Sequence, residues 1–90
     1  MNKARRKELM KLKERIENVR FEIDSVITEL TCNAQEEQEY LDNMPENLQG
    51  SERAEKTQET LDRLDEIIET LETVTSELED AETGIKEACG

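Results

Sequence analysis

The sequence predicts an all-α fold: an antiparallel, coiled-coil-like hairpin of two long helices, which assembles into a homo-oligomeric helical bundle. Three observations predict it. Residues 2–43 contain neither Gly nor Pro, and the chain's single Pro, Pro45, is followed closely by Gly50. Apolar residues recur at spacings of three and four before and after this break, which is typical of helices that pack along their length. Residues 1–90 therefore form one helical-hairpin domain with a short elbow at residues 44–50.

The first helix is predicted to run from about residue 3 to residue 43. Its apolar seam consists of Leu9, Leu12, Ile16, Val19, Ile23, Val26 and Leu30. Because a residue that precedes Pro avoids the helical region, the helix is expected to end near Asn43. Pro45 can then start a short turn that continues to Leu48.

The second helix is predicted to run from about residue 51 to residue 87. Ser51 is a favourable N-cap, and Glu52 and Glu55 place negative charge where the helix dipole favours it. The apolar stripe consists of Leu61, Leu64, Ile67, Ile68, Leu71, Val74, Leu78, Ala81 and Ile85. This stripe is wider than a coiled-coil seam, so the helix can contact more than one neighbour.

A hairpin that turns near Asn47 is predicted to pair residues whose numbers sum to about 94. The matched pairs are Leu30 with Leu64, Ile27 with Ile67, Ile23 with Leu71, Ile16 with Leu78, and Leu9 with Ile85. A slip by one heptad matches apolar residues equally well, so the short elbow has to fix the register. Cys32 and Cys89 lie far apart in this register and are expected to stay reduced.

The net charge of −12 is unevenly distributed. Residues 1–20 carry eight Lys or Arg and three Glu, a net charge of +5, whereas residues 21–90 carry −17. Such a basic arm occurs in proteins that bind nucleic acid or acidic membranes. We expect it instead to neutralise the acidic second helix beside it, so that neither duplex DNA nor a membrane is a partner. The acidic helix is too sparsely charged to mimic DNA strongly, since its residues carry about one net charge per 6–7 Å against one per about 1.7 Å in the duplex.

Self-association is expected because the chain is poor in material for a core of its own. Only 33% of the residues are hydrophobic and 2% are aromatic. One hairpin leaves the outer edges of both stripes exposed, whereas two hairpins packed as a four-helix bundle cover them. A homodimer or a higher oligomer is therefore predicted. The candidate oligomer contacts are Phe21, Val26, Ile27, Ile67, Ile68 and Val74.

No catalytic residue, cofactor site or metal site is predicted. The chain has two Cys and no His, which excludes the usual zinc spacings and Cys/His or Ser/His catalysis. Glu36, Glu39, Glu59 and Asp62 form an ExxE and ExxD pattern similar to that of the all-alpha nucleoside triphosphate pyrophosphohydrolases, which hold Mg²⁺ with helical carboxylates. An acidic residue three places after another occurs ten times in this chain, so composition accounts for the match. The protein is expected not to be an enzyme.

The segment EEQEYLDNMPENLQGSERAEK and the acidic repeat LDEIIETLETVTSELEDA resemble a group of small, acidic, helical proteins of phages and prophages of Gram-positive bacteria. The distinctive part is NMPENLQGSER, which covers the elbow. The resemblance implies a viral accessory protein without a known active site. No apolar run could span a bilayer or form a signal peptide, so the expected location is the cytoplasm of a bacterial host.

Three classes of function follow from these observations. The favoured one is a non-enzymatic binding protein, such as a counter-defence or host-takeover inhibitor, which binds a host protein or encloses a small ligand as an oligomer. The alternatives are a structural or assembly protein and, on the carboxylate pattern, a Mg²⁺-dependent pyrophosphohydrolase. Recognition is assigned to the elbow, since apolar side chains in a connector are not needed for a turn. Its candidate residues are Tyr40, Asn43, Met44, Pro45, Asn47, Leu48 and Ser51. A purely structural role for these residues, as helix caps and an end plug, remains the competing interpretation.

Overall fold

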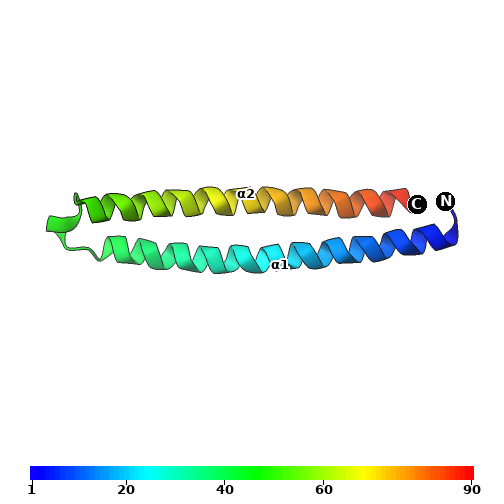
Figure 1. The fold of residues 1–90 in the computed structure, drawn as a ribbon, viewed down its shortest axis with the longest axis horizontal. Helices are drawn as coiled ribbons and strands as arrows, with labels where there is room; N and C mark the ends of the chain where they lie inside the picture. The colour runs from blue at the N-terminus through cyan, green and yellow to red at the C-terminus, as the bar shows by residue number, and fades with distance from the viewer.

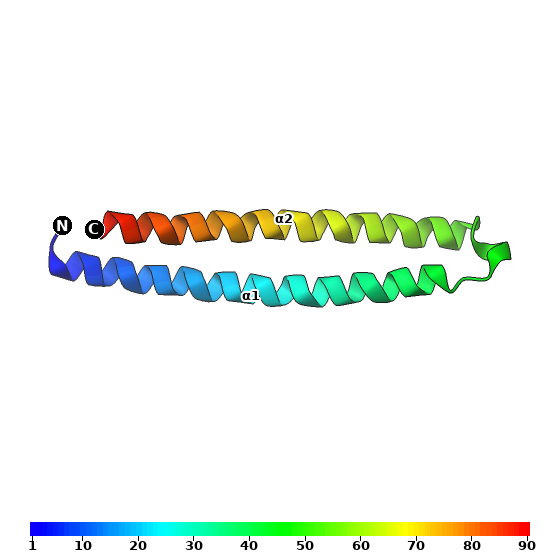
Figure 2. The same cartoon turned by 180° about the vertical axis from the view of Figure 1, so that it is seen from behind.

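The computed structural model describes residues 1–90 as two long helices joined by a short connection (Figure 1). α1 spans Lys3–Asp42, α2 spans Glu52–Ala88, and a single 3₁₀ turn, η1, spans Glu46–Leu48. The helices run antiparallel along their whole length, and both termini lie at the end opposite to the connection (Figure 2). The rod measures 70 × 14 × 13 Å. The predicted hairpin is confirmed, and each helix boundary lies within one residue of its prediction.

Short polar side chains begin both helices. The backbone N–H of Arg5 donates to Oδ1 of Asn2 at 2.7 Å, and that of Ala54 donates to Oγ of Ser51 at 3.3 Å. The first N–H groups of a helix have no partner within it, so each cap satisfies a donor that would otherwise depend on water. Ser51 is thus the N-cap that the sequence predicts. Neither helix contains a stretch long and apolar enough to cross a membrane.

The facing sides of the helices follow an unbroken heptad pattern, in which positions a and d are buried or half-buried. In α1 these positions are Leu9, Lys13, Ile16, Arg20, Ile23, Ile27, Leu30, Ala34, Glu37 and Leu41. In α2 they are Ala54, Thr57, Leu61, Leu64, Ile68, Leu71, Thr75, Leu78, Glu82, Ile85 and Cys89. We call this set the seam. Several of its layers are polar, which a single pair of helices tolerates because long side chains reach water from the seam.

The predicted seam of the first helix was wrong at every second position. Leu9, Ile16, Ile23 and Leu30 do face α2, but Leu12, Val19 and Val26 are exposed. The positions that they were expected to fill are occupied by Lys13, Arg20 and Ile27, one residue further along the chain. The predicted and the observed stripes of α1 both alternate by spacings of three and four residues. They share the residues at heptad position d, which are Leu9, Ile16, Ile23 and Leu30. The sequence of α1 alone therefore does not distinguish the two stripes.

The register also differs from the predicted one, by about one helical turn. Arg20 pairs with Glu79 and Glu82, and the Sγ of Cys89 lies 3.9 Å from the carbonyl oxygen of Arg6. The residue numbers in these three contacts sum to 99, 102 and 95. A sum of 98 sets every a position opposite a d position of the other helix, as antiparallel packing requires.

The basic arm is only partly neutralised by α2. Of its eight Lys and Arg residues, Arg20 alone forms an ion pair with α2, while Lys13 pairs with Glu17 within α1. The other six, which form no ion pair, are Lys3, Arg5, Arg6, Lys7, Lys11 and Arg15. The terminal end of the rod is therefore basic on its surface, and the elbow end is acidic.

Candidate binding surfaces

One long side of the rod carries most of the large exposed apolar residues of the two helices. These residues occupy heptad position g, next to the seam. The g positions of α1 include Leu12, Val19, Val26 and Tyr40, and those of α2 include Ile67, Val74, Ala81 and Ala88. In an antiparallel pair the g positions of the two helices lie on the same side. We call this side the apolar face.

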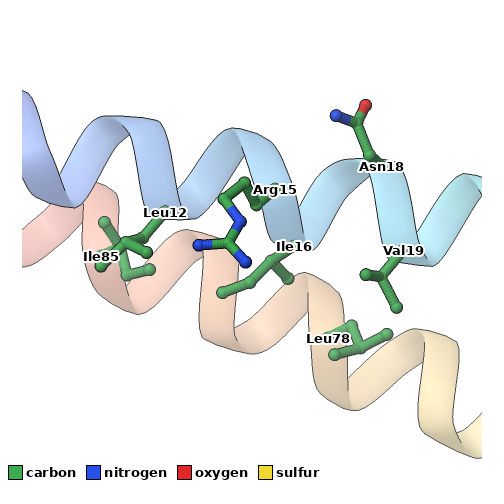
Figure 3. Close-up of a pocket in the computed structure, with 7 residues that line it drawn as sticks. All are labelled: Leu12, Arg15, Ile16, Asn18, Val19, Leu78 and Ile85. Carbon is green, nitrogen blue, oxygen red and sulfur yellow. The ribbon is translucent and has the colours of Figure 1, made fainter.

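A hollow lies between the apolar stripe of α1 and the seam residues of α2. Leu12 and Val19 of α1 line a hollow of about 650 Å³ together with Leu78 and Ile85 of α2. Figure 3 shows the side chains of Leu12 and Val19 directed toward α2, whereas Asn18 points away. The hollow lies where α2 carries the small residues Ala81 and Ala88 at position g, so the face has a depression beside its larger side chains.

The opposite long side of the rod is polar. Its residues occupy heptad position e, and Met10 is the only large apolar one among them. In α1 the others are Glu17, Asp24, Thr31 and Gln38, and in α2 they are Gln58, Asp65, Glu72, Glu79 and Lys86. We call this side the polar face. Apolar residues at a, d and one flanking position are typical of helices in a bundle, whereas a two-stranded coil needs only a and d.

A charged pair is embedded in the seam beneath this side of the rod. Nε of Arg20 donates to Glu82 at 2.6 Å, and its Nη2 donates to the other carboxylate oxygen at 3.1 Å. The side chains are 18% and 7% exposed. These hydrogen bonds lower the pKa of Glu82 below its ordinary value, and burial partly opposes them. The Arg20 guanidinium also lies 4.8 Å from the ring centroid of Phe21.

The elbow is closed by hydrogen bonds to its own backbone. Nε2 of Gln49 donates to the carbonyl oxygens of Met44 and Leu41 at 2.9 and 3.3 Å, and the Leu41 carbonyl also accepts from the backbone N–H of Met44. Oγ of Ser51 donates to the carbonyl oxygen of Leu48 at 2.6 Å. The Met44 side chain is only 8% exposed. Part of the elbow is therefore structural.

Among the predicted recognition residues, three side chains are exposed and free of capping roles: Tyr40, Asn47 and Leu48. Asn43 is the C-cap of α1, Pro45 precedes η1, and Ser51 caps α2. Tyr40 belongs to the apolar face and lines a hollow of about 360 Å³ with Glu52, Arg53, Lys56 and Thr57. The exposed residues thus form a small surface at the tip and the edge of the elbow.

The predicted oligomer contacts divide into three groups. Val26, Ile67 and Val74 lie on the apolar face. Ile27 and Ile68 lie in the seam within one hairpin, where they are half-buried. Phe21 is 56% exposed and occupies heptad position b, away from the apolar face and beside Arg20. Leu12, Tyr40 and Ala81 belong to the same face but were absent from the predicted oligomer contacts. Leu12 and Ala81 lie seven residues from Val19 and Val74, and Tyr40 lies fourteen from Val26, a spacing that places each on the same stripe of its helix.

The carboxylates of the ExxE and ExxD pattern do not converge. Glu36 and Glu39 lie at the outward positions c and f of α1, and Glu59 and Asp62 at f and b of α2, all of them exposed. No group of three or more Asp, Glu or Cys side chains is close enough to hold a metal ion. Cys32 and Cys89 are both free thiols.

Comparison with protein-family models, with curated proteins and with solved structures gave no match to this chain.

Proposed function

We propose that this chain is a non-enzymatic binding protein, which associates with a second copy through its apolar face and presents its elbow to a partner protein. The observation that supports this most is the difference between its two long sides. Val19 is 54% exposed and Tyr40 is 48% exposed on one side, while the other side is nearly all polar. Apolar side chains collected on one side of a soluble rod mark an interaction surface.

The elbow is the second surface, because it lies at the tip of a rigid rod and keeps exposed side chains after its caps are satisfied. Leu48 is 37% exposed in η1, although a turn needs no apolar residue there. The resemblance of the NMPENLQGSER segment to phage proteins favours a host protein as partner, in a counter-defence or host-takeover role. A rod with a polar side and a free tip suits such binding without any catalytic group.

The test of this function is capture of a partner from lysate of a Gram-positive host by the tagged chain. A Leu48→Ala variant is expected to lose the captured protein without a change in melting temperature. Met10→Ala is the matched control, since Met10 is an exposed apolar residue at the other end of the rod. Retention of the partner by Leu48→Ala, or its equal loss from Met10→Ala, would contradict an elbow site. Recovery of virion proteins instead of a host protein would point to an assembly role.

A further inference from the structure

We propose that the basic end of the rod binds the phosphate backbone of duplex DNA. The inference goes beyond the apolar face and the elbow and depends on neither of them. The expectation that DNA is not a partner rested on neutralisation of the basic arm by α2, and Arg20 is the only residue of that arm that α2 pairs. The candidate residues are the six cations of α1 that form no ion pair: Lys3, Arg5, Arg6, Lys7, Lys11 and Arg15.

The basic end lies partly beyond the helix that was expected to neutralise it. The Sγ of Cys89, the C-cap of α2, is 3.9 Å from the carbonyl oxygen of Arg6, so the residues before Arg6 extend past the end of α2. Figure 1 and Figure 2 both show the N-terminal end of α1 extending beyond the last turn of α2. Residues 1–15 carry seven Lys or Arg and two Glu, and residues 83–90 carry one Lys and one Glu. This end of the rod therefore has a net charge of +5, against −17 for residues 16–82.

Four of the six cations form a continuous row, which we call the cationic row. It consists of Lys3, Lys7, Lys11 and Arg15, which follow one another at intervals of four residues and are all exposed. Their heptad positions, e, b, f and c, run across the side of α1 that faces away from α2. At 1.5 Å per residue, successive members lie about 6 Å apart along the axis and the row is about 18 Å long. Only Arg15 borders the apolar face, where it lines the hollow, so the rest of the row stays accessible when that face is covered.

The cations lie where they lower the stability of α1. The dipole of a helix favours negative side chains in the first turn and disfavours positive ones. In α2 this turn holds Glu52 and Glu55. In α1 it holds no acidic residue and three cations, Lys3, Arg5 and Arg6. Like charges four residues apart, as in the cationic row, also repel one another. A bound polyanion offsets both effects, so these side chains suit a complex with an anionic partner better than the free hairpin.

Duplex DNA fits these cations better than a sparsely charged protein surface does. The net charge of α2 amounts to about one per 6–7 Å of its length, and α2 leaves the six cations unpaired. Duplex DNA carries one charge per about 1.7 Å. Glu8 and Glu14 border the cationic row, and neither of them forms an ion pair with it. The row is therefore free to bind phosphate groups.

Two other anionic partners fit less well. Binding to an anionic membrane needs apolar side chains that enter the lipid. The outward positions b, c and f between residues 3 and 15 hold no apolar residue larger than Ala4. Single-stranded nucleic acid is bound largely through stacking of its bases on aromatic side chains, and residues 1–20 contain none.

Fluorescence anisotropy of a labelled short duplex of mixed sequence tests the proposal with the full chain. We expect binding at micromolar protein in about 50 mM salt, weakened steeply as the salt is raised to about 200 mM. Each phosphate contact contributes about −0.9 to the slope of the logarithm of affinity against that of salt concentration, so roughly four to six contacts predict a slope of about −4 to −5. Absence of binding in about 50 mM salt, or a slope near zero, would overturn the proposal. So would binding to vesicles of phosphatidylglycerol without binding to the duplex.

Replacing the centre of the cationic row locates the site. Lys7→Gln together with Lys11→Gln is expected to weaken DNA binding by about tenfold or more and to make the salt slope shallower by about 2. Lys56→Gln together with Arg63→Gln is the matched control, since it removes the same charge from exposed positions in the elbow half of α2. Equal weakening in both double variants would overturn the site, because net charge alone would then account for binding.

The melting temperature separates DNA binding from a structural role of the same lysines. Lys7→Gln and Lys11→Gln relieve repulsion within the row, so the double variant should melt at the temperature of the natural chain or higher. The duplex should raise the melting temperature of the natural chain, as a ligand of the folded state does, and leave that of the double variant nearly unchanged. A double variant that melts lower, and loses affinity only in proportion to its unfolding, would show that the lysines are structural and would overturn the proposal.

Discussion

At the residue scale, the most informative feature is the polar content of the seam. Arg20 and Glu82 form a bidentate pair between the helices, where an apolar layer would bury more surface. A buried ion pair often adds little net stability, but it strongly disfavours any register that separates the two charges. The apolar residues of this hairpin fit more than one register, so the Arg20–Glu82 pair selects one register from among them.

The pair predicts a dependence of stability on pH. The pKa of Glu82 is lower in the folded chain than its ordinary value of 4.5, so the pair stabilises the fold fully above that value. The contribution is lost as the pH falls through the lowered pKa. Glu82→Gln should therefore unfold more easily than the natural chain at neutral pH, and the difference should shrink in acid. Urea unfolding of both proteins at several pH values measures this, and a difference independent of pH would contradict it.

Thr75 offers a second prediction at this scale. Its hydroxyl is buried in the seam without a hydrogen-bond partner, whereas Thr57 and Thr70 bond to carbonyl oxygens one turn earlier. An unpaired buried polar group costs free energy that an apolar group of the same shape does not. Thr75→Val should raise the free energy of unfolding by about 1 kcal/mol. Thr70→Val is the control at an exposed position, and an equal or smaller effect of Thr75→Val would contradict the burial.

At the element scale, α2 continues through Gly84 to Ala88, although Gly disfavours the helix interior. Nothing lies within 4 Å of a methyl group built on Gly84. Gly84→Ala should therefore stabilise the protein by about 0.5–1 kcal/mol, measured by thermal unfolding. Gly50→Ala is the control, since Gly50 lies outside both helices and also has open space around it. A loss of stability in Gly84→Ala would show that this position is covered by another chain.

Helix boundaries and the elbow could be predicted from the sequence because each depends on local chemistry. Pro45 ends α1 and starts η1, and Ser51 caps α2, as expected for these residue types. Which apolar stripe of α1 faces α2 could not be predicted from local chemistry. Leu12 and Val19 are as apolar as the residues of a seam, and the positions that face α2 instead hold Lys13 and Arg20.

The candidate surfaces were predictable to different degrees. Exposed apolar residues in the elbow, such as Leu48, follow from composition alone. Burial of Met44 does not, because it depends on how the end of the rod closes over α2. The seven-residue spacing groups the apolar residues of each helix into a stripe, but that the two stripes lie on the same side of the rod was recognisable only after the seam was known.

At the scale of the whole molecule, the antiparallel hairpin sorts its side chains onto two unlike faces. The sorting arises because the g positions of both helices are mostly apolar and the e positions are mostly polar. A shift of the register by one turn would separate Arg20 from Glu82 and leave two charges in the seam without their partners. The register of α1 against α2 therefore underlies the whole description of the hairpin.

Charge exchange across the seam tests that register most directly. Arg20→Glu alone sets two carboxylates against each other, and Glu82→Arg alone sets two guanidinium groups against each other, so each variant should melt at a clearly lower temperature. The double variant restores an opposite pair at the same place and should recover most of the lost melting temperature. A double variant that melts no higher than the less stable single variant would show that Arg20 and Glu82 are not neighbours, and would contradict the register.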